Sequence, residues 1–202
     1  NKFNLTKLYE VHPHYKSIIG SGGREKRLTT PIFEQIDAFT ETAYPQQDIC
    51  VLGLIRNERF YRHIPESFLD EHPNLHKYKV LVPAGNGSGT IGEVLSTPLI
   101  GEPLIGYTQS FIGFGRFETQ PEAEACLKYV KTRFARTLLG TLKVTQHNHK
   151  DTWRNVPLQD FTAQSDIDWS KSIPEIDQQL YTKYGLSSAE IAFIESKIKP
   201  ME

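Results

Sequence analysis

Basic side chains gather in two turn-rich segments of this sequence, the glycine-rich stretch 20–30 and the neighbourhood of Asn57. These side chains belong to Arg24, Lys26, Arg27, Arg56, Arg59 and Arg62. Loop arginines and lysines contact phosphate oxygens, and arginine also hydrogen-bonds to the edges of bases. The pattern indicates an anion or nucleic-acid binder, and the alternative is an ordinary solvated charged surface.

A third segment carries the spacing G-x-G-x-x-G of a dinucleotide-binding loop, from Gly87 to Gly92. In such a loop a strand turns tightly into a helix, whose N-terminus receives the pyrophosphate. Here Pro98 and Pro103 follow too soon for a helix of useful length. The loop with which methyltransferases hold S-adenosylmethionine is similar and also leads into a helix. We therefore interpret these glycines as allowing close backbone approach in a polar loop, to a ligand or to nucleic acid.

Histidine and aspartate pairs complete no catalytic or metal site in the sequence. The triplet 147–149 spells HNH, but the nuclease of that name needs its residues on separated elements around a metal. His12 and His14 have no carboxylate or cysteine cluster beside them to complete a coordination shell. Asp166 and Asp168 are expected to cap or turn the chain. We predict no catalytic residue, no metal and no cofactor in this chain.

Composition limits the class of protein. The 202 residues are 38% hydrophobic and 11% aromatic, as in a globular chain with a real core. The formal charge of -1 excludes a uniformly basic nucleic-acid binder but allows a local basic face. Cys50 and Cys126 are too few for a disulfide framework, which favours a reducing cytoplasm. No apolar run is long enough to span a membrane. Because the sequence begins with Asn1, we expect it to be a piece of a longer polypeptide.

The first part of the chain has the pattern of short strands and the last part that of helices. Runs of β-branched and aromatic residues between glycine and proline breaks predict strands at 48–55, 59–64, 77–83 and 107–115. The residues R-N-E between the first two strands predict a hairpin turn at Asn57. The order of the elements, strands before helices, predicts an α+β fold.

Three helices are predicted after residue 118. Apolar residues at helical spacing from Pro121 to Leu139 predict one long helix. Ser172 with Glu175, and Ser187 with Glu190, each form an S-x-x-E capping box that begins a short C-terminal helix.

Four stretches of the sequence carry a family resemblance. They are NGSGTIGEVLSTPLIGEPLIGYTQSFIGFGRFET, EAEACLKYVKTRFARTLLGTLKVTQ, TWRNVPLQDFT and SDIDWSKSIPEIDQQLYTKYGLSSAEIAFIESKIKPM. Together they resemble the C-terminal part of adenine-specific DNA methyltransferases of bacterial restriction-modification systems. The resemblance covers nearly the whole chain and is strongest from about residue 77 onward. Its most distinctive piece is W-x-x-V-P-L-Q-D-F, which begins at Trp153.

The resemblance implies a division of labour between two parts of a parent enzyme. The N-terminal part of such enzymes binds S-adenosylmethionine and carries a catalytic N-P-P-Y loop, and the C-terminal part selects the DNA sequence. This chain matches the second part, so S-adenosylmethionine is expected in the parent's N-terminal domain. We expect residues 1–165 to form a target-recognition-like α+β domain, with 166–202 as a helical extension packed on it.

The same resemblance turns the polar loops into candidate contacts with double-stranded DNA. The candidates are Arg24, Lys26, Arg27, Arg56, Arg59, Asn86, Ser88 and Thr90. Other expected partners are the methyltransferase domain of the same parent chain and restriction subunits, in the cytoplasm. The alternative is a protein-interaction module that joins methyltransferase and restriction subunits, and a third reading is an independent nuclease.

Overall fold

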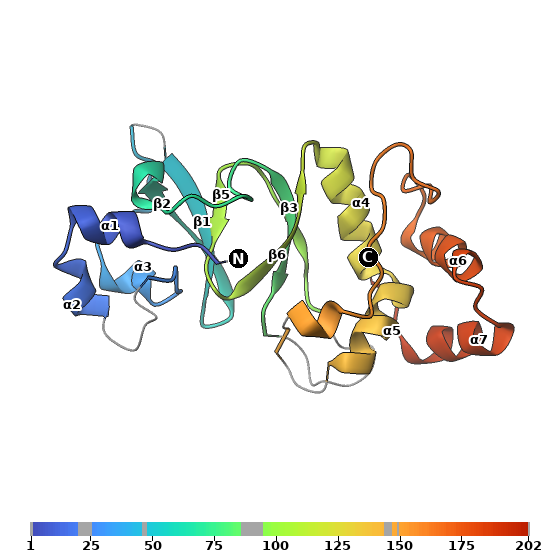
Figure 1. Ribbon diagram of the computed structural model, residues 1–202. Helices are drawn as coiled ribbons and strands as arrows, with labels where there is room; N and C mark the ends of the chain where they lie inside the picture. The colour runs from blue at the N-terminus through green and yellow to red at the C-terminus, as the bar shows by residue number, and fades with distance from the viewer. Residues whose placement is uncertain are drawn as a thin grey trace. The chain divides into compact units, whose positions relative to one another are not determined.

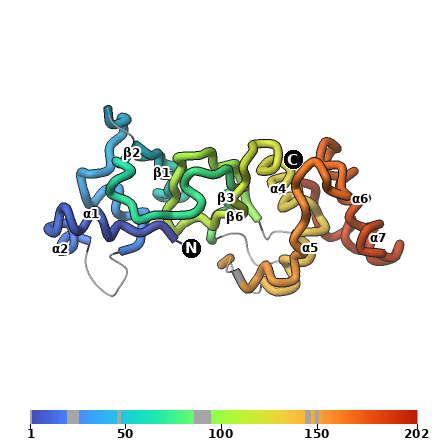
Figure 2. Tube along the Cα trace, turned by 45° about the horizontal axis from the view of Figure 1, so that its top comes forward, coloured from blue at the N-terminus to red at the C-terminus, as the bar shows by residue number. Residues whose placement is uncertain are grey.

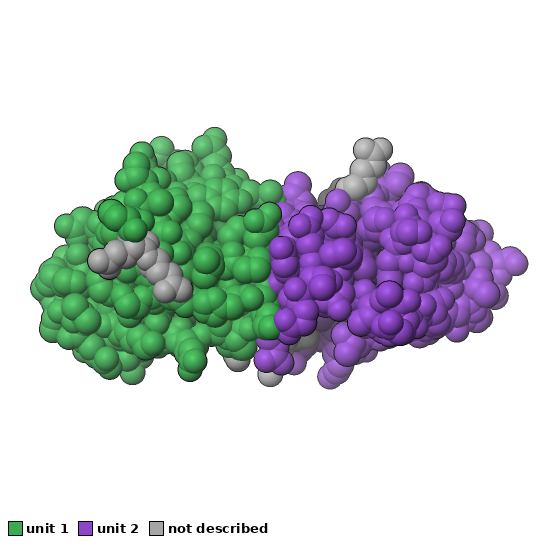
Figure 3. All heavy atoms as spheres, turned by 90° about the horizontal axis from the view of Figure 1, so that it is seen from above, with its two compact units in different colours: residues 1–77, 101–112 green, residues 78–100, 113–202 purple. Residues whose placement is uncertain are grey.

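A computed structural model describes residues 2–19, 26–45, 48–85, 95–143, 147–148 and 150–201. The chain divides into two compact units (Figure 3). The first unit comprises residues 1–77 and 101–112, and the second comprises residues 78–100 and 113–202. Both units combine helices with a small sheet, which confirms the predicted α+β class.

The first unit is built on a three-stranded sheet in the order β2-β1-β5 (Figure 1). Strands β1 (Asp48–Ile55) and β2 (Glu58–Pro65) pair antiparallel along their whole length. The short strand β5 (Ile105–Tyr107) pairs parallel with β1. Only two residues join β1 to β2, which confirms the turn predicted at Asn57.

Short helices accompany this sheet. They are α1 (Thr6–Val11), α2 (Tyr15–Ile19), α3 (Ile32–Gln35) and the 3-10 turn η1 (Glu66–Phe68). Figure 2 shows that the chain passes through α1 and then α2. A Cβ at Gly53 of β1 would lie 2.5 Å from the ring of Phe33 in α3. Glycine at this position therefore allows the helix to pack closely on the strand.

The second unit has a sheet in the order β4-β3-β6, followed by helices. Its strands are β3 (Tyr78–Pro83), most of β4 (Leu99–Gly101) and most of β6 (Phe111–Phe117). The last residue of β4 and the first two residues of β6 are counted with the first unit. Its helices are α4 (Gln120–Lys131), α5 (Arg133–Leu142), the 3-10 turn η2 (Lys150–Trp153), α6 (Ile173–Lys183) and α7 (Ser188–Lys197). Val80 and Val82 of β3 pack against Cys126 and Val130 of α4, which covers the sheet.

The C-terminal helices begin where their capping boxes predict. The backbone N–H of Ser172 donates to the Glu175 carboxylate over 3.0 Å, and that of Ser187 donates to the Glu190 carboxylate over 2.8 Å. Residues 166–202 belong to the second unit, in which Ile176, Leu180 and Ile194 share one apolar cluster with Phe134 of α5.

The segment predicted as one helix, 121–139, is divided at Thr132 into α4 and α5. Thr132 is extended, with φ −58° and ψ 149°, and its hydroxyl accepts a hydrogen bond from the Ala135 N–H. Asp177 of α6 accepts two further bonds, from the N–H groups of Arg133 and Phe134 over 3.0 and 2.9 Å. These acceptors satisfy donors that a continuous helix would have bonded internally.

The strand predicted at 107–115 is likewise two strands, β5 and β6, with a turn between them. The Phe111 N–H donates to the Thr108 carbonyl, and the Ser110 N–H reaches the Thr108 hydroxyl at 3.4 Å. Local hydrogen bonds from hydroxyl side chains stabilise such turns against a continuous strand. Within the described ranges, no helix combines the length and the apolar character needed to cross a membrane.

Candidate nucleic-acid interface

The turn between β1 and β2 holds two residues in the left-handed region of backbone space. Arg56 has φ 52° and Asn57 has φ 68°, and Ile55 pairs directly with Glu58 across the turn. Positive φ at both central residues is typical of the type I′ turn, which matches the twist of a two-stranded ribbon. Asparagine adopts this conformation readily, whereas arginine at the first position is unusual and costs about 1 kcal/mol.

The tip of this ribbon is polar and open to solvent. Arg56, Asn57, Glu58 and Arg59 are all exposed. Arg62, farther along β2, is instead held against the unit: its guanidinium lies 3.0 Å from the Glu41 carboxylate and 5.7 Å from the centre of the Phe60 ring. Arg56 and Arg59, both predicted from the sequence, therefore lie together at the exposed end of a rigid ribbon. We call residues 56–59 the hairpin tip.

Lys26 and Arg27 lie on a separate segment of the same unit, and both are exposed. Arg27 forms an isolated antiparallel bridge with Asn4, the Leu5 N–H donates to the Lys26 carbonyl over 2.7 Å, and the Leu28 N–H donates to the Phe3 carbonyl. This pairing fixes the backbone from which the two side chains extend.

The other four predicted contacts, Arg24, Asn86, Ser88 and Thr90, lie outside the described residues. The structure therefore brings together two of the eight candidates at the hairpin tip and places two more on the segment 26–27.

Three of the four histidines that the sequence analysis considered lie within the described residues. His12 and His14 stack edge to face, with ring centres 5.9 Å apart, and His147 is exposed beside a bridge to Gly85. Among the described residues, no three His, Cys, Asp or Glu side chains are grouped so that they could hold a metal ion.

The two aspartates expected to cap or turn the chain have structural partners. Asp166 forms an ion pair with Lys183 at 2.7 Å. The Asp168 carboxylate accepts hydrogen bonds from the backbone and hydroxyl of Ser170, and these bonds hold the pKa of Asp168 below its usual range.

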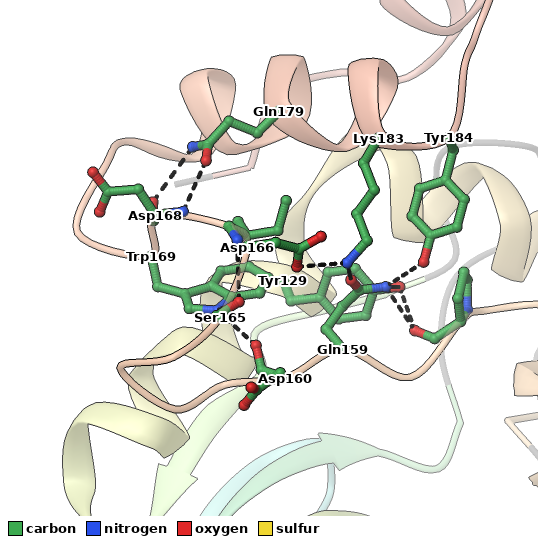
Figure 4. Close-up of polar contacts among 12 residues, drawn as sticks. Tyr129, Gln159, Asp160, Ser165, Asp166, Asp168, Trp169, Gln179, Lys183 and Tyr184 are labelled. Atoms are coloured by element: carbon green, nitrogen blue, oxygen red, sulfur yellow. Dashed lines mark hydrogen bonds and ion pairs between the residues drawn. The ribbon is translucent and has the colours of Figure 1, made fainter.

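The stretch V-P-L-Q-D-F, which begins at Val156, is held by a polar network in the second unit (Figure 4). The Gln159 side-chain amide donates to the hydroxyls of Tyr129 and Tyr184, over 3.4 and 2.8 Å, and its oxygen accepts from Lys183 over 3.0 Å. The Trp169 indole N–H donates to the Asp160 carbonyl over 2.9 Å. Burial raises the pKa of the Tyr129 hydroxyl, which keeps that group a neutral donor to the Pro157 carbonyl. These contacts give the stretch a structural role, tying it to α4 and α6.

Two hollows differ in character from the hairpin tip. One in the first unit, of about 1000 Å³, is lined by three carboxylates, one lysine and two histidines: Glu66, Asp70, Glu71, Lys7, His72 and His76. This excess of carboxylates makes it unsuited to phosphate. One in the second unit, of about 420 Å³, is lined mainly by apolar and aromatic side chains and is bordered by Leu158, which is 92% exposed.

The hairpin tip differs from both hollows in carrying two exposed arginines beside one exposed carboxylate, that of Glu58. Its two guanidinium groups can bond phosphates or guanine edges, and the Asn57 amide offers both a donor and an acceptor. Comparisons of the chain with protein-family models, with curated proteins and with solved structures find no match.

Proposed function

We propose that this chain is the sequence-recognition part of an adenine-specific DNA methyltransferase, and that its hairpin tip enters the major groove of DNA. One observation carries the proposal: Arg56 occupies a left-handed position at the exposed end of a two-stranded ribbon. Backbone strain of this kind persists where the surrounding structure over-determines it, and such strained residues cluster at functional sites. The resemblance of the sequence to the C-terminal parts of such methyltransferases supports the same conclusion.

The shape and chemistry of the tip suit the major groove. This groove is about 12 Å wide and admits a two-stranded ribbon. Arginine bonds guanine in a bidentate manner, asparagine bonds adenine, and a carboxylate accepts from the cytosine amino group. We assign base contacts to Arg56, Asn57 and Glu58, and a phosphate contact to Arg59.

The remaining predicted partners follow from this role. Lys26 and Arg27 are proposed as additional phosphate contacts, and S-adenosylmethionine is proposed to bind the methyltransferase domain of the parent enzyme. Such a protein meets DNA in the cytoplasm, together with any restriction subunits of the system.

A salt series tests the proposal with a matched control. Fluorescence anisotropy would measure the binding of the 202-residue chain to duplex DNA at several salt concentrations. We expect Arg56→Ala/Arg59→Ala to lower the affinity about tenfold and to reduce the slope of log K against log salt by about 1, because one phosphate contact is lost.

The control is Lys16→Ala/Arg154→Ala, which also removes two exposed positive charges. Its affinity should stay within about twofold of the parent, because neither residue belongs to the hairpin tip or to the segment 26–27, and other exposed charges contribute only screened attraction. Equal losses in the two double variants would refute the assignment of the hairpin tip.

A second candidate function is a module that joins the methyltransferase to restriction subunits. It is favoured by Leu158, a large apolar side chain that is 92% exposed beside an apolar hollow. Exposed apolar patches of this kind mark protein-interaction sites. This candidate predicts no DNA affinity at low salt and tight co-purification with the methyltransferase part, which Leu158→Asp would disrupt.

A further inference from the structure

Helix α7 carries apolar side chains beyond the side that packs into its own unit. Ile194 is buried in the cluster shared with α5 and α6, whereas Phe193 is 50% exposed. Ala189 and Ala192 are also exposed and carry no polar group. A surface helix normally places charged or polar residues on the side away from the core.

A hollow of about 450 Å³ lies between α5 and α7. Its lining comes from both helices and from Leu186: Phe134, Thr137 and Leu138 of α5, and Ala189, Glu190, Phe193 and Ile194 of α7. Its walls are almost entirely apolar, and the Phe193 side chain stands at its border. An aromatic ring and a space suited to an aromatic ring therefore lie next to each other on one surface.

The charges on this side of α7 are arranged symmetrically about Phe193. At 100° per residue, Glu190, Phe193 and Lys197 fall within about 60° of one another around the helix. The acidic residue lies toward the N-terminal end and the basic residue toward the C-terminal end. If two copies of α7 are placed antiparallel with Phe193 opposite Ile194, Glu190 of each copy faces Lys197 of the other.

The geometry points to a second copy of this chain as the partner of this surface. In the resulting two-fold dimer the α7 helices pack antiparallel, and each Phe193 enters the hollow beside the other copy's α7. Two Glu190–Lys197 pairs flank the rings. Such an interface is isologous, because the same patch supplies both the inserted ring and the space that receives it. This inference goes beyond DNA recognition and does not depend on it.

The expected dimer is weak. A helix of ten residues is about 15 Å long, so one helix and its adjoining hollow bury less than a standard interface of about 800 Å² per partner. We expect a dissociation constant on the order of 0.1 mM, which falls among transient interfaces.

Sedimentation velocity of the full 202-residue chain without DNA, from about 10 µM to about 1 mM, tests the dimer. The parent should shift from monomer to dimer across this range, and Phe193→Asp should remain monomeric. The control Leu158→Asp changes another exposed apolar residue of the same unit and should dimerise like the parent. Thermal unfolding of both variants checks that each is folded.

A charge test then addresses the antiparallel register. Lys197→Glu replaces each of the two Glu190–Lys197 pairs of the dimer with a pair of carboxylates that repel each other. We expect it to raise the dissociation constant of the dimer about fivefold or more. Adding Glu190→Gln removes the repulsion and keeps a capping-box residue, so the double variant should recover part of the affinity. A parent that stays monomeric at 1 mM, equal effects of Phe193→Asp and Leu158→Asp, or no recovery in the double variant would overturn the inference.

Discussion

At the scale of single residues, Arg56 and Asn57 combine a backbone requirement with exposed functional groups. The sequence predicts the turn, because asparagine between two strand-like runs tolerates the left-handed conformation. It does not reveal that Arg56 shares this conformation, since arginine carries no such preference. The strain at Arg56 becomes visible only when the register Ile55–Glu58 leaves exactly two residues for the turn.

Substitutions of Asn57 separate its backbone role from its amide. Asn57→Gly should keep or slightly raise stability, because glycine adopts positive φ freely, whereas Asn57→Ala should lower it by about 1 kcal/mol. Both variants lose the amide and should bind DNA with an altered base preference. Denaturant unfolding and selection from randomised duplexes measure the two effects. An unchanged base preference in both variants would show that Asn57 does not contact bases.

Lys79 is a residue whose buried charge makes stability depend on pH. It lies on β3 and is fully buried, and burial lowers its pKa from 10.5 to about 7. Between these values the unfolded chain binds a proton that the folded chain lacks, so this group makes the folded state more stable as pH rises from about 7 toward 10.5.

Lys79→Met removes this dependence. Its stability relative to the parent should be greatest near pH 7 and should shrink by about 2 kcal/mol or more by pH 10. Urea unfolding at several pH values measures the difference in the free energy of unfolding. Lys16→Met, which replaces an exposed lysine in the same way, is the control. A constant difference between Lys79→Met and the parent across the range would show that Lys79 does not titrate in this window.

At the scale of elements, the break between α4 and α5 marks the limit of local prediction. Apolar spacing runs through Thr132 without interruption, so the sequence predicts one helix. The decisive acceptors come from Asp177, which is 44 residues farther along the chain than Arg133. Capping boxes, by contrast, are complete within four residues, and for that reason the starts of α6 and α7 were predictable.

The break between α4 and α5 predicts that stability is sensitive to substitution of Asp177. Asp177 is buried, and its removal would leave the N–H groups of Arg133 and Phe134 without their acceptor. We expect Asp177→Ala to lower the free energy of unfolding by about 2 to 4 kcal/mol. Asp166→Ala, which removes an exposed partner of Lys183, should lower it by less than about 1 kcal/mol. Similar effects of the two substitutions in denaturant unfolding would contradict this account of the break.

At the scale of the whole molecule, the sequence predicts the α+β class and the order of the elements but not the division into two units. The chain leaves the first unit after residue 77 and returns to it for residues 101–112. No break in the sequence marks the last two crossings, because they fall inside strands: one between residues 100 and 101 in β4, and one between residues 112 and 113 in β6. The candidate interface shows a similar limit: the sequence predicts a hairpin with Arg56, Arg59 and Arg62 around its turn. The structure adds that Arg56 and Arg59 are exposed, whereas Arg62 pairs with Glu41.

The central claim is that the hairpin tip contacts DNA, and nuclear magnetic resonance tests it most directly. In a ¹H–¹⁵N spectrum of the 202-residue chain titrated with duplex DNA at low salt, the amides of residues 55–59 should shift and broaden progressively. The amides of α6, in the second unit, should move little. Binding that leaves residues 55–59 unperturbed, or no binding at low salt, would contradict the account.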